Sequence, residues 1–306
     1  MTLTELRYIV AVAREKHFGH AAEACFVSQP TLSVAIKKLE EELDVKLFER
    51  GASEVSVTAL GEAIVRQAQI VIEQAAAIRE IAKRGKDPLA GPLKLGIIYT
   101  IGPYLLPELV KNVIELSPQM PLMLQEQFTV KLLEMLRTGD LDCAILAEPF
   151  PDTGLAVAPL YDEPFVIAVP KNHPLAKRKS VSAEELKQET MLLLGTGHCF
   201  RDHVLEVCPE YARFSSDAEG IRKSFEGSSL ETIKHMVASG MGVTVVPQLG
   251  MPREPQQHVA YVRFAAPVPT RRVVLAWRRS FTRYEAIAAL RNAVYACKLD
   301  GVTRLS

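Results

Sequence analysis

The chain contains few cysteines and no long hydrophobic run. Its 306 residues include five cysteines, and an odd count in a long chain argues against a secreted disulfide framework. Apolar stretches such as residues 192–194 and 243–246 fall far short of the ~20 apolar residues that cross a bilayer. The N-terminus carries Glu5 and Arg7 and lacks the apolar core of a signal peptide. We therefore expect a cytoplasmic protein with no membrane partner, in which any disulfide depends on redox state.

An excess of positive charge is also missing. The chain has 36 Lys and Arg against 36 Asp and Glu, and residues 1–60 hold seven basic and nine acidic side chains. A DNA-binding segment of this composition must focus positive charge on one face and act in several copies. The sequence has no P-loop, dinucleotide-binding glycine pattern or Gly-x-Ser-x-Gly elbow. Nucleotide and esterase chemistry therefore have no support.

Residues 1–60 show the periodicity of three short helices. Apolar residues between Leu3 and Ala13 recur at helical spacing and predict a helix that ends near residues 17–19. A second helix fits residues 19–25, and Ser28 is suited to be the N-cap of a third. Residues 47–50 and the alternating residues 53–58 predict a β wing. Together these elements predict a winged helix-turn-helix domain over residues 1–60.

In a helix-turn-helix, the start of the third helix faces DNA. Side chains there reach base edges, and basic residues further along, such as Lys37 and Lys38, reach phosphates. Arg50 in the wing would contact the backbone or the minor groove. The predicted DNA-binding residues are Ser28, Gln29, Pro30, Thr31, Ser33, Lys37 and Arg50. The alternative is an ordinary three-helix packing motif whose apolar stripes form only a core.

The next segment reads as one long helix that Gly85 and Pro88 end. Its apolar residues form a seam along one side, which commonly pairs with a copy of itself. The seam consists of Ile64, Ala68, Val71, Ala75 and Ile78. We assign residues 61–87 to a linker and dimerisation helix, the alternative being that the helix packs on its own chain.

Residues 88–306 change character and alternate short apolar strands with helical stretches. This alternation predicts an α/β domain with mainly parallel sheets, in which ligands bind at the carboxyl ends of strands. Thr100 and Thr129 would lie at such strand ends and face a cleft, unless both are only turn or capping residues.

Cys199 has more polar neighbours in the sequence than the other cysteines. It follows His198 at a predicted helix start, and Arg201 comes two residues later. A helix N-terminus and a nearby cation lower the pKa of a thiol, and the thiolate is the form that attacks peroxide. His198, together with Thr100 and Thr129, could donate hydrogen bonds to the peroxide. The remaining cysteines apart from Cys208 are assigned to the core: Cys25, Cys143 and Cys297.

The spacing of Cys199 and Cys208 indicates a switch. A helix over residues 199–207, ended by Pro209, separates the two Cα atoms by ~13.5 Å at 1.5 Å per residue. A disulfide needs Cα atoms within ~4.4–6.8 Å, so the thiols can join only if the segment unwinds. Two alternatives remain. One is a zinc site of His198, Cys199, His203 and Cys208, in which Cys208 lies too far along the helix to complete a tetrahedron, and the other is a pair of unrelated structural thiols.

The run LRYIVAVAREKHFGHAAEACFVSQPTLSVAIKKLEEELDVKLFER resembles the winged helix-turn-helix of the LysR-type bacterial transcriptional regulators. The resemblance continues through the linker helix over essentially the full chain, and LDCAIL and VASGMGVTVVP resemble the effector domain of that family. It implies an α/β protein with a long linker helix and a two-lobed, periplasmic-binding-protein-like regulatory domain over residues 88–306. Lobe I would comprise about 88–162 and 268–306, and lobe II about 163–267. The family also implies promoter DNA, RNA polymerase and further copies of the chain, as a dimer and then a tetramer, as partners.

The segment GTGHCFRD, with a second cysteine nine residues after the first, resembles the peroxide-sensing OxyR-type branch of this family. Matched position by position, Cys199 becomes the peroxidatic thiol and Cys208 the resolving thiol. Thr100, Thr129, His198 and Arg201 become the residues that bind or activate hydrogen peroxide. The resemblance implies a transcriptional activator without cofactor, metal or enzymatic turnover.

Two other functions compete with peroxide sensing. One is a LysR-type regulator that responds to a small organic effector in the cleft between the lobes, with incidental cysteines. The other is a thiol peroxidase. The helix-turn-helix argues against this function, because a peroxidase does not need a DNA-binding domain for turnover.

Overall fold

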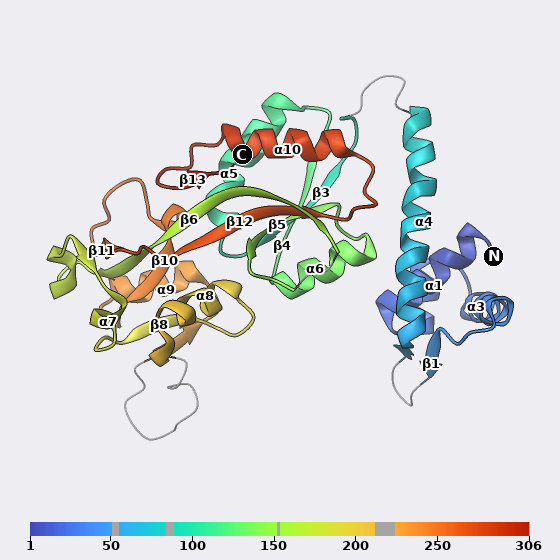
Figure 1. The fold of residues 1–306 in the computed structure, drawn as a ribbon, viewed down its shortest axis with the longest axis horizontal. Helices are drawn as coiled ribbons and strands as arrows, with labels where there is room; N and C mark the ends of the chain where they lie inside the picture. Colours follow the sequence, from blue (N-terminus) through green and yellow to red (C-terminus); the bar gives the residue numbers. More distant parts are fainter. Residues whose placement is uncertain (51–54, 84–88, 152–153, 212–223, 306) are drawn as a thin grey trace. The chain divides into compact units, whose positions relative to one another are not determined.

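The computed structural model describes residues 1–50, 55–83, 89–151, 154–211 and 224–305 (Figure 1). One compact unit contains the N-terminal residues, and a second contains most of the chain from residue 89 onward. The first unit begins with α1 (Leu3–Glu15), α2 (Phe18–Ala24) and α3 (Gln29–Leu43). The antiparallel pair β1 (Phe48–Arg50) and β2 (Val55–Val57) follows. The predicted helices and wing are confirmed, with α1 ending slightly earlier than expected.

Capping side chains define where these helices start. Thr2 and Glu5 form a capping box at α1, and Ser28 Oγ accepts a hydrogen bond of 3.3 Å from the Thr31 N–H at α3. Each of the three helices contributes one apolar face to a shared core. Its buried members include Leu6, Ile9, Val12, Ala21, Ala22, Leu32, Ile36, Leu39 and Leu47. Burial of this face therefore fixes which side of α3 points outward.

The long helix α4 (Ala59–Lys83) follows the wing. The residues of its apolar seam lie in two environments, and the pairing of this seam with a second copy stays a prediction. Ile64 and Ala68 pack into the three-helix core beside α1, which was the alternative assignment. Val71 and Ile78 remain 37% and 69% exposed.

The second unit contains a nine-stranded mixed sheet within the described residues. Along its main path the strand order is β4 (Leu122–Gln127), β3 (Leu93–Ile98), β5 (Cys143–Glu148), β12 (Thr270–Trp277), β6 (Ala156–Pro170), β11 (Val259–Phe264) and β7 (Ser180–Val181). Two further strands, β10 (Thr244–Pro247) and β13 (Thr303–Arg304), also pair with β6. A separate parallel pair is formed by β8 (Met191–Leu194) and β9 (Ser224–Gly227).

The strands and helices form two lobes, as predicted. Around β3, β4 and β5 in lobe I lie α5 (Gly102–Leu116), α6 (Thr129–Thr138) and α10 (Tyr284–Ala296) (Figure 1). Lobe II carries α7 (Ala183–Leu186), α8 (Cys199–Val207) and α9 (Leu230–Ala238) beside β8, β10 and β11 (Figure 1). Its short 3₁₀ turns are η1 (Pro174–Lys177) and η3 (Gln248–Gly250). A core cluster that includes Phe165, Leu193, Phe200 and Val246 holds lobe II together.

The expectation of mainly parallel sheets is wrong for the strands that connect the lobes. Strands β3, β4 and β5 are parallel, but β12 runs antiparallel to both β5 and β6. The chain leaves lobe I along β6 and returns along β12, so these neighbours must point in opposite directions. Their register places Arg271 opposite Glu163, which brings two charged residues to the junction of the lobes.

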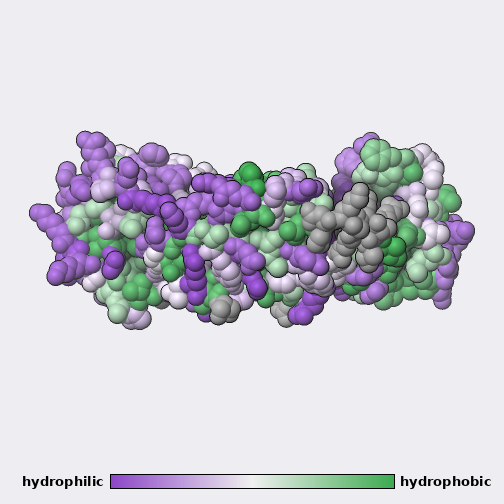
Figure 2. All heavy atoms as spheres, turned by 90° about the horizontal axis from the view of Figure 1, so that it is seen from above, coloured by the Kyte–Doolittle hydropathy of each residue, from purple (hydrophilic) through white to green (hydrophobic). Residues whose placement is uncertain are grey.

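The outer end of lobe II is polar. Figure 2 shows hydrophilic side chains gathered at its left-hand end, which is the lobe II end in the orientation of Figure 1. Residues 177–180 there are all exposed. No helix in the described part of the chain has the length and apolar character needed to cross a membrane.

Candidate functional site

Helix α8 positions the first of the two cysteines at a junction between the lobes. It begins at Cys199 with His198 as its N-cap, and it ends at Val207 with Cys208 as its C-cap. Phe200, His203 and Val204 are buried on its inner face. The predicted bounds of this helix are confirmed. Both Cys199 and Cys208 are free thiols in this structure.

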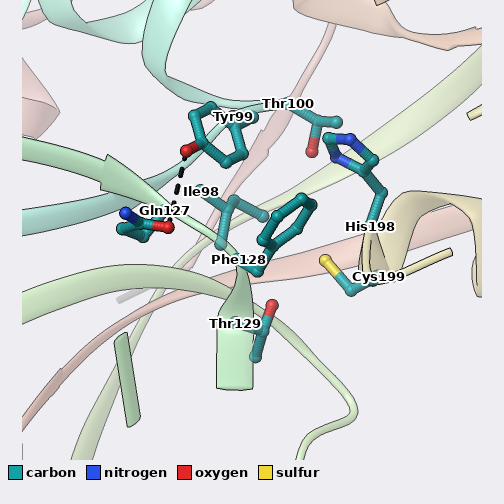
Figure 3. Close-up of a pocket in the computed structure, with 9 residues that line it drawn as sticks. Ile98, Tyr99, Thr100, Gln127, Phe128, Thr129, His198 and Cys199 are labelled. Carbon is teal, nitrogen blue, oxygen red and sulfur yellow. Dashed lines mark hydrogen bonds between the residues drawn. The ribbon is translucent and has the colours of Figure 1, made fainter. Parts of the chain in front are cut away.

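Three separate segments meet at Cys199 and form a small pocket (Figure 3). The side chains of Thr100, Thr129, His198 and Cys199 converge on it, as the sequence predicts. The full lining consists of Ile98, Tyr99, Thr100, Gln127, Phe128, Thr129, Gly197, His198 and Cys199. These residues lie at the end of β3, between the end of β4 and the start of α6, and at the start of α8, so the pocket depends on both lobes being in place.

The pocket is very small. It encloses about 170 Å³, open solvent included, and only about 10 Å³ of that space admits the centre of a water-sized molecule. One water-sized molecule needs roughly 10–15 Å³ by that measure, whereas sites for organic ligands span roughly 300–1,000 Å³. In this conformation the pocket therefore has room for at most about one water-sized molecule and is too small for an organic effector.

Aromatic rings that the sequence analysis missed form one wall of the pocket. The Phe128 ring lies 4.8 Å from the His198 ring and 5.2 Å from the Tyr99 ring, measured between centroids, in edge-to-face geometry. Gly197, with φ of 99°, brings the chain so close that an added Cβ would lie 3.4 Å from the Phe128 ring. The only feature of the sequence that could have indicated Tyr99 and Phe128 is their position directly before Thr100 and Thr129.

His198 has a defined protonation pattern in the pocket. Its Nε2 lies 3.2 Å from the Ser228 carbonyl oxygen, which can only accept, so Nε2 donates and Nδ1 of the neutral ring is an acceptor. Burial lowers the pKa of His198 and keeps the ring neutral. This differs from our expectation that His198 donates to a peroxide, since the free ring nitrogen accepts a proton instead.

The predicted low pKa of the Cys199 thiol is not found. Burial raises the pKa, and the Thr129 hydroxyl and the positive charge of Arg271 oppose that rise. Thr129 Oγ1 is buried and, among the described residues, has no hydrogen-bond partner within the usual distance and angle limits. The cation that acts on Cys199 is therefore Arg271, in place of the predicted Arg201. Arg201 Nη1 donates instead to the Leu194 carbonyl oxygen at 2.9 Å.

Arg271 is part of a buried network beneath Cys199. It is 2% exposed, and its Nη2 lies 2.7 Å from Oε2 of Glu163, which is fully buried. Its Nη1 donates to Thr100 Oγ1 at 2.8 Å, and Nη2 donates to the Thr100 carbonyl at 2.9 Å. The Thr100 hydroxyl oxygen is thus occupied as an acceptor, which leaves its proton available for a molecule in the pocket. The guanidinium also lies 5.0 Å from the centroid of the Phe200 ring.

Cys208 lies in a different environment from Cys199. It is fully buried in the lobe II core, and burial raises its pKa to about 12. Next to it, the hydroxyl of buried Tyr211 donates to the Leu186 and Glu189 carbonyl oxygens. The Cys208 thiol is therefore protonated and enclosed while α8 stands.

The other cysteines and the zinc alternative give no second site. Cys143 and Cys297 are buried as predicted, but Cys25 is the C-cap of α2 and only partly buried, because α2 ends one residue before it. In the ranges that the structure describes, no three His, Cys, Asp or Glu side chains are placed to hold a metal ion. The zinc reading of His198, Cys199, His203 and Cys208 therefore has no geometric support.

The predicted DNA-binding residues lie along the outer side of α3. Four of them at its start, Ser28, Gln29, Pro30 and Thr31, are exposed, as is Lys37 one turn further on, and Ser33 is half-buried. The backbone of Arg50 belongs to β1, and its side chain is outside the described residues. The core thus directs polar side chains outward from the start of α3, where a recognition helix needs them.

Comparison with known proteins places both units in one family. Residues 3–62 match the bacterial regulatory helix-turn-helix protein, lysR family, and residues 86–296 match the LysR substrate binding domain. The DNA-binding transcriptional dual regulator OxyR of Escherichia coli K12 is 39% identical over 305 residues, covering 98% of this chain and 97% of the relative. A hydrogen peroxide-inducible genes activator of Pectobacterium carotovorum is 39% identical over 292 residues, covering 94% and 95%.

Solved structures agree with this placement. A full-length OxyR variant from Pseudomonas aeruginosa is 50% identical with a TM-score of 0.80, covering 97% of this chain and 96% of that one. A hydrogen peroxide-bound OxyR mutant from Corynebacterium glutamicum is 34% identical with a TM-score of 0.62, covering 96% and 93%. The chain belongs to the LysR family of bacterial DNA-binding transcriptional regulators, which are not enzymes, and within that family to the OxyR-type branch.

Proposed function

We propose that this protein is a transcriptional activator that senses hydrogen peroxide through a reversible Cys199–Cys208 disulfide. The observation that carries the proposal is the pocket at Cys199, which combines a thiol, two hydroxyls and a neutral imidazole in a space of water size. An organic effector would need a larger cavity. The names of the relatives in E. coli and P. carotovorum support the same function.

In the first step the Cys199 thiolate attacks one oxygen of hydrogen peroxide. An S–O bond forms, the O–O bond breaks, and the leaving hydroxide takes up a proton to become water. Thr100 donates a hydrogen bond to the peroxide, because Arg271 already occupies its oxygen as an acceptor. His198 Nδ1 accepts a hydrogen bond from the peroxide, and Thr129 lies beside the sulfur. The product is a sulfenic acid on Cys199.

In the second step Cys208 resolves the sulfenic acid. Its thiolate attacks the Cys199 sulfur, an S–S bond forms, and the S–O bond breaks to release a second water after protonation. While α8 stands, the two Cα atoms are ~13.5 Å apart along the helix, against the ~4.4–6.8 Å of a disulfide. The segment therefore unwinds before the bond forms, which converts a local oxidation into a change of shape. Unwinding also exposes Cys208 to water and removes the burial that raises its pKa.

The change of shape acts on promoter DNA through copies of the chain. Exposed apolar residues of α4, among them Ile70, Val71 and Ile78, are suited to pair with a second copy as a dimer, and dimers assemble into a tetramer. Several copies supply the phosphate contacts that one near-neutral domain lacks. The domains proposed are 1–60 for DNA binding, 61–87 for dimerisation and 88–306 for regulation. RNA polymerase is the expected further partner, in the cytoplasm.

Peroxide titration of the purified full-length protein tests the proposal. Wild type should lose two thiols per chain, and mass spectrometry should find Cys199 joined to Cys208. Cys199→Ser keeps the side-chain volume and should abolish the response while DNA binding persists. The control Cys297→Ser removes a buried thiol outside the pocket and should respond like wild type. A normal peroxide response in Cys199→Ser would overturn the assignment and favour an effector in the cleft.

A further inference from the structure

His203 lies on α8 between the two cysteines and connects this helix to the opposite lobe. Its side chain is buried, with 6% exposed. Nε2 lies 2.9 Å from the carbonyl oxygen of Glu148, at the end of strand β5 in lobe I. A carbonyl only accepts, so Nε2 carries the proton and donates. Nδ1 is then a buried acceptor without a hydrogen-bond partner among the described residues.

Two other polar contacts at α8 stay within lobe II. His198 and Arg201 hydrogen-bond to the Ser228 and Leu194 carbonyl oxygens, and both acceptors belong to lobe II. The His203 bond instead crosses from α8 to lobe I. It therefore breaks whenever α8 leaves its place between the lobes, whether or not lobe II itself changes.

The surroundings keep the His203 ring neutral and in one orientation. Burial and the positive charge of Arg271 both lower its pKa. The Phe165 ring lies 6.2 Å and the Phe200 ring 6.5 Å from the His203 ring, measured between centroids. Because the imidazole is enclosed in this way, releasing it from the Glu148 carbonyl oxygen removes one hydrogen bond and moves a buried ring.

We propose that His203 is a positioning residue for the redox switch: its hydrogen bond to Glu148 holds α8 in place and thereby sets the rate at which Cys208 reaches oxidised Cys199. This inference rests on the proposed disulfide function and adds a residue to it. His203 touches neither the peroxide pocket nor the Cys208 sulfur in the contacts described. It acts on the second step of the reaction and leaves the first step unchanged.

Three substitutions at His203 separate the hydrogen bond from the bulk of the side chain. Glutamine places an amide N–H about as far from the backbone as Nε2 of histidine, so His203→Gln preserves the donor. Asparagine is polar but one methylene shorter, and His203→Asn cannot reach the Glu148 carbonyl from the same backbone. His203→Leu fills the space and removes the donor. A buried carbonyl left without its donor destabilises the closed helix.

The test follows both steps in the full-length protein after a single pulse of hydrogen peroxide. A sulfenic-acid-specific label, read by mass spectrometry, gives the rate of formation of sulfenic acid on Cys199 and the rate of its decay into disulfide. We expect formation at the wild-type rate in all three variants. Decay should be about 5–100-fold faster in His203→Asn and His203→Leu, and within about twofold of wild type in His203→Gln.

The other possible outcomes would each overturn a specific part of the proposal. Wild-type decay rates in His203→Asn and His203→Leu would overturn the positioning role. Decay in His203→Gln as fast as in His203→Asn would also overturn it, because the hydrogen bond would then not be the cause. If His203→Leu does not fold, the comparison of Asn with Gln decides alone. Absence of sulfenic acid in wild type would overturn the disulfide function itself, and with it the inference.

Discussion

Helices α3 and α8 each begin after a polar residue, yet their ends are built differently. In α3, the Ser28 hydroxyl accepts from the Thr31 N–H, and Asp44 closes the helix in the left-handed conformation with its N–H donating to the Glu40 carbonyl. In α8, the N-cap His198 makes no side-chain capping bond, and its Nε2 instead hydrogen-bonds to the Ser228 carbonyl oxygen. The first helix is thus stabilised at its own ends, and the second depends on its surroundings.

The two helices also differ in the side chains that they bury. The buried residues of α3 are all aliphatic, namely Leu32, Ile36 and Leu39, whereas α8 also buries the polar side chain of His203. A helix capped locally and packed on an apolar core presents a rigid surface to a partner. A helix whose stability comes from side chains of other elements can open when those contacts break. This difference suits α3 to reading DNA and α8 to switching.

The largest predicted effect concerns the support beneath α8. Arg271→Leu leaves the buried Glu163 carboxylate without its partner and should lower the free energy of unfolding by about 3–5 kcal/mol. The neighbouring Arg272→Ala is the matched control. The side chain of Arg272 is 49% exposed in its ion pair with Asp162, so its loss should cost about 0.2–1 kcal/mol. Urea unfolding of the reduced variants measures both, and equal losses would show that the buried pair contributes no more to stability than the exposed pair.

A smaller effect is expected on α3, and it should leave the peroxide response intact. Gln29→Ala should relax base preference, at about 1–3 kcal/mol for a lost base contact. Arg50→Ala should weaken binding to all sequences and reduce its salt dependence. Footprinting and binding titrations over a range of salt concentrations distinguish these results. A footprint unchanged in both variants would remove α3 and the wing from the DNA interface.

The most gradual predicted effect is a dependence of Cys199 oxidation on pH. Burial raises the pKa of Cys199 above the ordinary thiol value, so the thiol is mostly protonated at neutral pH. The oxidation rate should rise by up to about tenfold per pH unit from about pH 6 to about pH 9. Stopped-flow oxidation at low peroxide measures this profile. A plateau beginning below neutral pH would mean that the thiolate is already formed in the reduced state.

The sequence predicts the two helices better than the pocket between the lobes. Ser28 and Pro30 mark the start of α3, and Pro209 marks the end of α8, because capping and proline geometry are local signals. The four residues that converge at the pocket are predicted through the family resemblance and by their places at strand or helix ends. The sequence therefore predicts an element well where a few adjacent residues determine its start or its end.

The remaining features depend on pairing between distant segments. Arg271 reaches Thr100 and Glu163 only because β12 returns antiparallel to β6, and apolar alternation carries no information on strand direction. The burial that raises the Cys199 pKa likewise comes from other elements packed around it. The sequence analysis therefore chose Arg201, the nearest cation in sequence, over Arg271, whose positive charge acts on the Cys199 thiol in the structure.

Amide hydrogen exchange across α8 tests the central claim most directly. Residues 203–207 should exchange slowly in reduced wild type and rapidly once the Cys199–Cys208 disulfide has formed. In peroxide-treated Cys208→Ser, sulfenic acid should remain on Cys199 and the same amides should stay slow, while the amides of α3 stay unchanged in every sample. Equal protection of residues 203–207 in reduced and disulfide-bonded wild type would mean that α8 does not unwind, and would contradict the switch.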